Sequence, residues 1–438
     1  MRNTNKKGFT IVELVIVVAV IAILAAVLIP TFSSIIKKAN IASDTAVAKN
    51  LNTAAISAGA KDFDSAIEAV KDAGYLLANL NAKADGCYFV WDNVNNQFLL
   101  VDTKNDYKVI YSNTDASEKS ANNWLVAVSD PEAIAAIKAA GCGVKQIATD
   151  YEDLMANLAA GGEVYVDESV VLNNDNRLVF DDNKETIINL GSSSINTSGI
   201  VRPENPGDKD NNLAVPIYVK NGTVTFKGGN ISVAGESQNL DNRTVKIVMR
   251  TEAGSTVNFE DTYIDSSTFN GQIKIGGTAN LKNVIIKATK VGVDTTGSSV
   301  VVLDNVTINM IKGNADDSYG AWVWACNSDH KGTENSITIK SGTYTRENIG
   351  GTYGGIVSCG GVVNIEGGTF TAEDGKYFSF GTDGLNNKIV ITGGTFDGYT
   401  FDELYAGTAD IDWADLCVGD YTITTSEYED KPAVVITK

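Results

Sequence analysis

The side chains best suited to chemistry or ligand binding gather in one polar stretch, residues 310–336. Within nine residues this stretch holds two adjacent carboxylates and three large aromatic rings: Asp316, Asp317, Tyr319, Trp322 and Trp324. Because Trp322 and Trp324 are separated by one residue, both would project from the same face of a strand. Flat aromatic rings offer an apolar surface on which a sugar ring can stack. The sequence therefore predicts a ligand-binding site made of these five residues, with the alternative that the two tryptophans pack into the core.

The same stretch raises an enzymatic alternative. The pair Asp316-Asp317 with Asp329-His330 could act as the two acids of a polysaccharide hydrolase, one protonating the leaving oxygen and one activating water. The chain lacks the Gly-His-Gly element and the downstream Arg-x-Lys pair of β-helical hydrolases. Adjacent aspartates in loops are more often solvated turn residues. We therefore expect no catalytic residue, no cofactor and no metal site.

Glu13 is the second residue with a specific chemical role, because it interrupts a long apolar segment. Residues 9–29 would span roughly 32 Å as an α-helix at about 1.5 Å per residue, enough to cross a hydrocarbon core. Glu13 is the only charged residue among them. An ionised carboxylate is costly inside a membrane, so we expect a partner for it. An ordinary secretory signal would have a shorter apolar core and no glutamate within it.

The start of the chain resembles the class III signal of type IV prepilins and pseudopilins. Two lysines precede Gly8 and Phe9, as in the site that a prepilin peptidase cleaves in that family. Glu13 is then the fifth mature residue, where the family has its glutamate, and Pro30 also matches. The resemblance implies cleavage between Gly8 and Phe9, N-methylation of Phe9, and packing of the helix into a filament. The amine of Phe9 in one subunit would pair with Glu13 of a neighbour, so that two costly charges stabilise each other.

Charge and cysteine content bound the environment of the chain. Its 438 residues carry a net charge of −19, which repels nucleic acid and excludes it as an expected partner. Basic residues precede the apolar segment and acidic sequence follows it, which predicts a cytoplasmic leader and an exterior remainder. The cysteines are odd in number, so at least one stays unpaired within the chain. Pairs Cys87–Cys142 and Cys326–Cys359, or buried thiols, all remain open.

The N-terminal part predicts an α+β, pilin-like unit. Residues 1–8 form the leader, and 9–59 form a long helix that spans the membrane over 9–29. Residues 60–148 form a small head, in which strands at 87–91 and 97–101 make a hairpin and 108–111 a third strand. Ser65 with Glu68, and Thr149 with Glu152, have the spacing of capping boxes at the start of short helices. Another helix is expected from Asp130 to Gly141.

From Thr149 onward, one pattern of residue types recurs. Counted from its first apolar residue, a second apolar residue follows two positions later, a turn-forming residue four positions later and a third apolar residue seven positions later. The nine starts are Val164, Ile188, Val224, Val257, Ala279, Val301, Ile337, Val363 and Ile389. Such a repeat is typical of a solenoid. The prediction for 149–438 is an all-β, parallel, right-handed β-helix with a cap helix at its start and an irregular cap after Phe401. A β-sandwich is the alternative, but it does not explain the repeat.

This region resembles the β-helices of surface adhesins and pectate-lyase-like proteins, in architecture only. The sequence as a whole predicts a minor or tip-located subunit of a surface filament, made as a single-pass membrane precursor. Its expected partners are a prepilin peptidase, other pilin subunits, the membrane and a glycan or host surface ligand. A membrane- or pilus-anchored polysaccharide lyase or hydrolase is the second hypothesis, and a pseudopilin of a secretion or DNA-uptake machine is the third.

Overall fold

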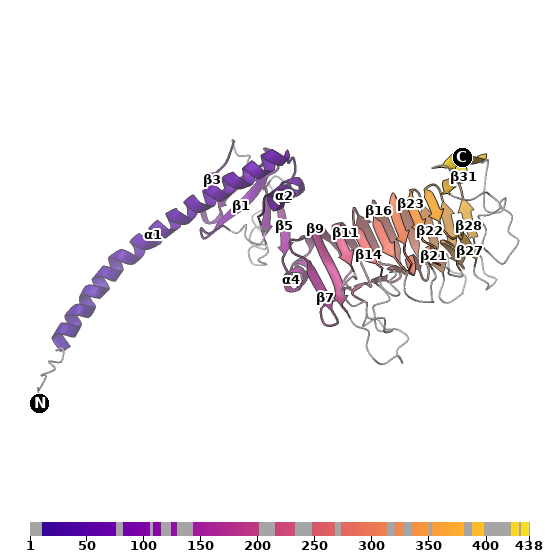
Figure 1. Cartoon of the computed structure of the whole chain (residues 1–438). Helices are drawn as coiled ribbons and strands as arrows, with labels where there is room; N and C mark the ends of the chain where they lie inside the picture. The colour runs from indigo at the N-terminus through magenta and orange to yellow at the C-terminus, as the bar shows by residue number, and fades with distance from the viewer. Residues whose placement is uncertain are drawn as a thin grey trace, which may run out of the picture. The chain divides into compact units, whose positions relative to one another are not determined.

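The computed structural model (Figure 1) describes residues 11–75, 82–105, 108–114, 124–128, 143–200, 215–232, 248–267, 273–312, 320–326, 335–349, 353–380, 388–397, 422–428 and 431–437. These residues form two compact units, divided between Val144 and Lys145. The division falls just before the expected boundary at Thr149.

Helix α1 (Ile11–Ala58) is the first element and runs without interruption for 48 residues. Its first half is apolar and exposed, whereas Ala48, Leu51 and Ala55 in its second half are buried. Gly59 follows with a positive φ of 70°, which ends the helix without the steric cost that a Cβ would bring. The long N-terminal helix predicted from the apolar pattern is therefore confirmed.

The second half of α1 packs on α2 (Phe63–Asp72) and on a small antiparallel sheet. The sheet has the order β4, β1, β2, β3, with bounds Trp124–Val128, Cys87–Asp92, Gln97–Asp102 and Lys108–Tyr111. A 3-10 turn, Thr103–Asn105, follows β2. The predicted hairpin and third strand are confirmed. The helix expected from Asp130 to Gly141 lies outside the described residues.

The start of α2 differs from the expected Ser65–Glu68 capping box. Asp62 is the N-cap, and its Oδ1 accepts a hydrogen bond from the backbone N of Ser65 at 2.8 Å. The Ser65 hydroxyl in turn accepts from the backbone N of Asp62 at 3.3 Å. Ser65 therefore closes the capping box from the third helical position and does not open it, because an aspartate stands three residues before it.

The second unit is a solenoid in which each complete turn contributes one strand to each of three faces. The first face contains β6 (Gly162–Val166), β9 (Glu185–Gly199), β11 (Thr223–Ser232), β13 (Thr256–Glu260), β16 (Thr278–Lys282), β19 (Val300–Asp304), β22 (Ser336–Ile339), β25 (Val362–Ile365) and β28 (Lys388–Ile391). The second face contains β7 (Val170–Asn173), the later halves of β9 and β11, β14 (Tyr263–Ser266), β17 (Ile285–Ala288), β20 (Val306–Met310), β23 (Gly342–Arg346), β26 (Thr369–Ala372) and β29 (Gly394–Asp397).

The third face is a separate 8-stranded sheet. It contains β8 (Leu178–Phe180), β10 (Ile217–Val219), β12 (Met249–Thr251), β15 (Ile273–Ile275), β18 (Val291–Thr295), β21 (Ala321–Cys326), β24 (Ile356–Cys359) and β27 (Phe378–Phe380). Neighbouring strands on this face run parallel throughout, as β18 and β21 do. The predicted parallel β-helix is therefore confirmed, and the β-sandwich alternative is excluded.

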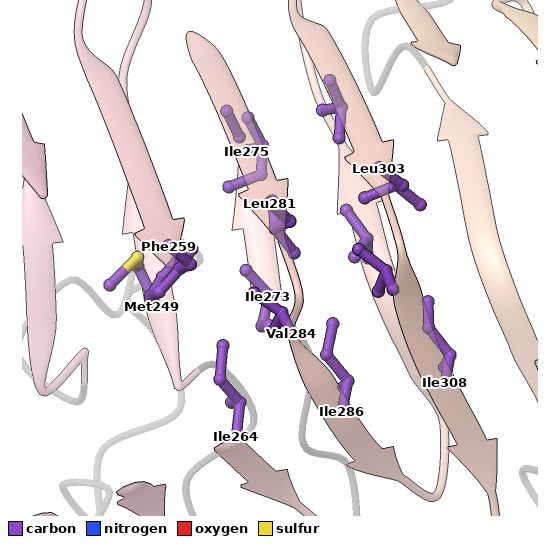
Figure 2. Packing of buried hydrophobic residues seen from close by; sticks show 14 of the residues in the cluster. Met249, Phe259, Ile264, Ile273, Ile275, Leu281, Val284, Ile286, Leu303 and Ile308 are labelled. Carbon is purple, nitrogen blue, oxygen red and sulfur yellow. The ribbon is translucent and has the colours of Figure 1, made fainter. Parts of the chain in front are cut away.

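The repeat positions stack in register and build the core. Phe259, Leu281 and Leu303 form one inward ladder, and Ile264, Ile286 and Ile308 form another (Figure 2). All six residues are buried. Neighbouring parallel strands lie about 4.8 Å apart, so each apolar side chain contacts its equivalents in the coils before and after it.

The first two copies of the repeat follow a different register from the one predicted. Ile188 aligns with Phe226 and not with Val224, because the pairing of β9 with β11 shifts near Gly191. Val164 aligns with Ile188 and is displaced in the same way. The prediction that Val171 points inward is wrong, since Val171 is 54% exposed. Val170, the residue aligned with Ile195, is the buried one.

Both ends of the solenoid carry additional elements. At the start, β5 (Gly143–Ala148) pairs in parallel with β6, and α4 (Tyr151–Ala160) connects them and places Leu154 and Leu158 on the core. The N-cap of α4 is Asp150, so Thr149–Glu152 is not its capping box. At the end, β31 (Lys431–Thr437) pairs antiparallel with β29 and with β30 (Thr422–Tyr428). A regular hairpin thus covers the edge strand β29, where the sequence suggested an irregular cap.

Candidate functional site

The first functional region is the exposed apolar half of α1. By length and composition α1 is able to cross a membrane. Its large apolar side chains point outward along this half, from Ile11 at 82% exposure to Ile29 at 67%. Such a continuous apolar surface is stable in lipid or against other apolar helices, but not in water.

Glu13 lies in the first turn of this helix, where a carboxylate interacts favourably with the helix dipole. It is the acidic residue whose pairing with a neighbouring subunit the sequence predicts. Gly8 and Phe9, the predicted cleavage and methylation residues, lie outside the described residues. The structure therefore fixes the helical position of Glu13 but leaves the cleavage site as a prediction.

Comparison with known proteins identifies this N-terminal segment. A family model described as "Prokaryotic N-terminal methylation motif" matches residues 3–29. Over 43 residues the chain is 60% identical to the type IV wide pilus major component PilA4 of Thermus thermophilus. That match covers 10% of this chain and 30% of the relative, so the chain spans less than a third of the curated relative it matches. No solved structure matches the chain.

Helix and motif together show that the chain begins with a type IV prepilin-like N-terminus. This N-terminus is that of a membrane-anchored precursor that enters an extracellular filament. This chain joins that N-terminus to a small α+β unit and a parallel β solenoid.

The second candidate region is the stretch around β21, and there the structure separates the two tryptophans. Trp322 is 0% exposed and lies in the solenoid core, with its ring 5.8 Å from Phe370 and 6.0 Å from Tyr377 between centroids. Its Nε1 donates a hydrogen bond to the backbone O of Thr345 at 2.8 Å. The prediction that Trp322 is a surface ligand residue is therefore wrong.

Trp324 lies on the outer side of the same strand. It is partly exposed and packs beside Val291 and Val357, with its ring centroid 4.8 Å from that of Tyr353. Consecutive residues Trp322 and Val323 both face the core, so the strict alternation on which the sequence prediction depended is broken between them. Only Trp324 of the pair is available to a ligand.

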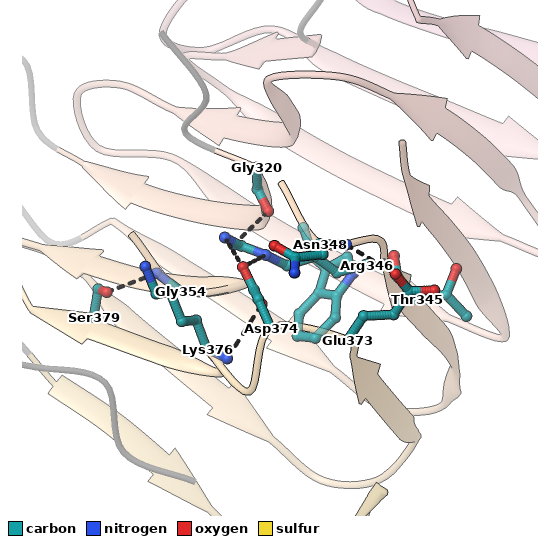
Figure 3. A network of polar contacts seen from close by, with 10 residues as sticks. Gly320, Thr345, Arg346, Asn348, Gly354, Glu373, Asp374, Lys376 and Ser379 are labelled. Atoms are coloured by element: carbon teal, nitrogen blue, oxygen red, sulfur yellow. Dashed lines mark hydrogen bonds and ion pairs between the residues drawn. The ribbon is translucent and has the colours of Figure 1, made fainter. Parts of the chain in front are cut away.

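The three remaining predicted ligand residues, Asp316, Asp317 and Tyr319, lie outside the described residues, as do Asp329 and His330. The described residues on either side of 313–319 are tied to the next coil. The backbone N of Lys312 donates to Glu347 Oε2 at 2.7 Å. Arg346 Nη1 donates to the backbone O of Gly320 at 2.8 Å (Figure 3). Residues 313–319 therefore connect two anchored ends.

Arg346 is a buried charged residue beside this stretch that the sequence reasoning missed. It occupies an inward position of β23, aligned with Met310 in the coil before and Ala372 in the coil after. Asp374 Oδ2 accepts hydrogen bonds from its Nε at 3.2 Å and its Nη2 at 2.9 Å. Burial lowers the pKa of Arg346, and Asp374 opposes this effect. An arginine at an inward repeat position was the available signal.

The described cysteines lie in β1 and on the third face of the solenoid. Pairing of β21 with β24 aligns Cys326 with Cys359 in adjacent coils. Cys87 is a buried thiol whose pKa is raised, mainly by burial, and Cys142 lies outside the described residues. Across the part of the chain that the structure describes, no group of three His, Cys, Asp or Glu side chains could hold a metal ion.

Proposed function

We propose that this chain is a minor or tip-located subunit of a type IV pilus-like filament that displays its β solenoid for adhesion. The observation that supports this function is the presence of a prepilin motif and a solenoid in one chain. The motif supplies attachment to a filament, and the solenoid supplies long flat faces. The unit formed by residues 145–438 is much larger than the N-terminal helix that would pack into the filament. Subunits of this size would crowd one another along the filament if they occupied every position.

Assembly in this proposal depends on the N-terminus. A prepilin peptidase cleaves between Gly8 and Phe9, and Phe9 is N-methylated. Glu13 then pairs with the amine of Phe9 in a neighbouring subunit, since an isolated carboxylate is costly in an apolar environment. The apolar surface from Ile11 to Ile29 packs against equivalent helices.

The proposed ligand of the solenoid is a glycan or another component of a host or environmental surface. An anchored polysaccharide lyase or hydrolase is the alternative proposal, and it differs by releasing cleaved product. A pseudopilin of a secretion or DNA-uptake machine is a third proposal, which the net charge of −19 disfavours where DNA is the cargo.

Assembly is tested by co-expressing the full chain with a prepilin peptidase and the other subunits of a type IV filament. Wild type and Glu13→Ala should both be cleaved, but only wild type should appear in sheared filaments, detected by antibody against the solenoid. Glu13→Asp serves as the charge-preserving comparison. Equal incorporation of Glu13→Ala would contradict the assembly role of Glu13.

Adhesion is tested with the same cells on surfaces coated with neutral polysaccharides, acidic polysaccharides or mucin glycans. Cells with the full chain should be retained more strongly than cells whose chain lacks residues 145–438, with no new reducing or unsaturated ends. Release of such ends would favour the enzymatic proposal. Equal retention of both strains would remove the support for an adhesive solenoid.

A further inference from the structure

One continuous row of large side chains crosses the outer side of the third face. Each of five successive strands contributes one residue at the same register: Tyr218, Arg250, Lys274, Asp294 and Trp324. Because neighbouring parallel strands lie about 4.8 Å apart, the row extends roughly 19 Å along the solenoid axis. We call these five residues the outer row.

The outward direction of the row follows from the burial of its neighbours. Ile217 and Val219 flank Tyr218 in β10, and both belong to the solenoid core. Ile273 and Ile275 flank Lys274 in the same way. Side chains alternate along a strand, so the residue between two inward neighbours points away from the core.

These residue types are not those that an exposed strand position favours. Asp and Lys are depleted in strands, whereas Thr fits an outward, half-buried position well. On the second face one outward position is threonine in four successive coils, Thr307, Thr343, Thr369 and Thr395, whereas another aligns Asp265, Lys287 and Asn309. The outer row differs from this charged row by the aromatic rings at its two ends, Tyr218 and Trp324.

At one end of the row, Tyr218 and Arg250 contact each other and share Glu252 as a partner. The hydroxyl of Tyr218 donates to Glu252 Oε1, and Arg250 Nε lies 3.1 Å from the same oxygen. The Arg250 guanidinium carbon is 5.8 Å from the centroid of the Tyr218 ring, a cation–π distance. Tyr218 is itself buried, so this end presents Arg250 and Glu252 in a fixed arrangement, with little conformational entropy left to lose when a ligand binds.

The other end is apolar and aromatic. Trp324 is partly exposed, and Tyr353 contacts it edge to face with centroids 4.8 Å apart. Val291 and Val357 support the pair from below. Between the two ends, Lys274 and Asp294 lie side by side in adjacent strands. Lys274 offers a donor, whereas the carboxyl group of Asp294 is largely desolvated.

Charge selects the kind of ligand. Arg250 and Lys274 lie beside Glu252 and Asp294, and two further cations, Lys220 and Lys290, lie near Tyr218 and Asp294. The chain as a whole is strongly acidic, with a net charge of −19. An anionic polymer would be repelled by this net charge, whereas a neutral polymer would not. A neutral polymer with many hydroxyl groups suits the alternating donors and acceptors.

We propose that the outer row binds a linear neutral polysaccharide that runs along the solenoid axis. Trp324 and Tyr353 stack on a sugar ring, and Lys274 and Glu252 exchange hydrogen bonds with hydroxyl groups of successive sugars. This inference rests on the proposed adhesive function and names the site and the ligand class for it. It replaces Trp322, which is buried, with residues of five different coils.

The test uses the full chain in detergent micelles and calorimetric titration with neutral β-linked glucose, mannose and xylose oligosaccharides of increasing length, and with oligogalacturonate as the acidic probe. At least one neutral series should bind, with affinity rising with length until the row is filled. Trp324→Ala and Lys274→Ala should each weaken binding at least tenfold. Thr343→Ala and Thr369→Ala, at outward positions of the second face, are the matched controls and should bind as wild type does.

Trp324→Phe keeps an aromatic ring and should retain most binding, which separates stacking from a loss of fold. Unchanged affinity in Trp324→Ala and Lys274→Ala, preference for the acidic probe, or loss of binding in the threonine controls would overturn the site. Cells that still adhere to neutral glycan surfaces with both row variants would preserve the adhesive function but reject this row. Wild-type cells that do not adhere and a chain that binds no probe would reject both.

Discussion

Arg346 and Asp374 form an ion pair inside the solenoid, with Arg346 Nη2 2.9 Å from Asp374 Oδ2. Arg346 is only 1% exposed, and the coils on either side place Met310 and Ala372 at its position. The same guanidinium donates a hydrogen bond to the backbone O of Gly320, the residue before β21 (Figure 3). A single buried charge thus connects three successive coils next to residues 313–319.

We predict that Asp374→Asn lowers the free energy of unfolding by about 3 kcal/mol, because it leaves the buried Arg346 charge without its counterion. The double variant Arg346→Met with Asp374→Asn should recover part of this loss, since it removes the charge as well and matches Met310 in the preceding coil. Urea unfolding of the full chain in micelles, followed by circular dichroism in the β region, measures both. A double variant less stable than Asp374→Asn would contradict the ion-pair explanation.

The corners of the middle coils depend on an asparagine ladder. Asp261, Asn283 and Asn305 adopt positive φ angles of 53°, 55° and 54°. Asn283 Nδ2 donates to Asp261 Oδ1, and Asn305 Nδ2 donates to Asn283 Oδ1, both at 2.9 Å. Asparagine satisfies both needs of the corner, the left-handed backbone and the contact to the next coil.

We predict that Asn283→Gly destabilises the solenoid by about 1 kcal/mol, through loss of the two side-chain hydrogen bonds. Asn283→Ala should cost roughly 1 kcal/mol more, because alanine also bears the strain of the left-handed conformation. Thermal unfolding of the two variants beside wild type measures the difference. An alanine variant as stable as the glycine variant would show that backbone conformation does not decide this corner.

Periodic features of the fold were predictable from the sequence because they depend on burial that repeats. The frame at Val257, Ala279 and Val301 predicted three aligned inward positions, and the register confirms them. The register of the first two coils was not predicted, because the pairing shifts locally near Gly191 without a change in the pattern of residue types. In the last three coils the positive φ lies one residue later than expected, at Gly342, Gly368 and Gly394.

The candidate site was harder to predict because it depends on residues from different coils. Trp322 and Trp324 have the spacing of two outward residues. The Trp322 ring nevertheless packs against Gly355, where a Cβ atom would lie only 2.1 Å from the ring. The outer row joins residues that are 20 or more positions apart, such as Arg250, Lys274 and Asp294. Each is an ordinary polar residue in sequence, and only the register of the coils aligns them.

The N-terminal unit depends on an amide of α1 that pairs with a strand. Asn52 Oδ1 accepts from the backbone N of Phe98 at 2.7 Å, and its Nδ2 donates to the backbone O of the same residue at 2.8 Å. Asn52 is buried. Its side chain therefore completes the hydrogen bonding of β2 at Phe98, beyond the residues of β2 that pair with β3.

We predict that Asn52→Ala weakens this unit by about 3 kcal/mol, because it leaves two buried backbone groups unpaired. Amide hydrogen exchange of the β2 segment should then accelerate roughly a hundredfold, as a tenfold change corresponds to about 1.4 kcal/mol. Thr53→Ala, on the exposed side of the same helix turn, is the matched control and should leave exchange unchanged. Equal protection in Asn52→Ala and wild type would show that the amide pair does not hold β2 to α1.

Asp294 should make the stability of the solenoid depend on pH. Burial raises its pKa from 3.8 to about 7, and the nearby Lys274 and Lys290 oppose this increase. The folded state therefore binds the proton more tightly than the unfolded state does. The resulting stabilisation is complete below about pH 4 and is lost as the pH rises through 7. The gap between the two pKa values corresponds to at most roughly 4 kcal/mol.

Replacing Asp294 by asparagine isolates this contribution from the pH response of the other acidic residues. We expect the stability advantage of Asp294→Asn over wild type to be small near pH 5 and larger at pH 8, where the wild-type carboxylate is charged in a desolvated position. Urea unfolding at pH 5, 6, 7 and 8 gives the difference between the two proteins at each pH. A constant difference would mean that Asp294 titrates as in the unfolded chain. A difference that grows between pH 5 and 8 would place a titrating carboxyl group in the middle of the outer row.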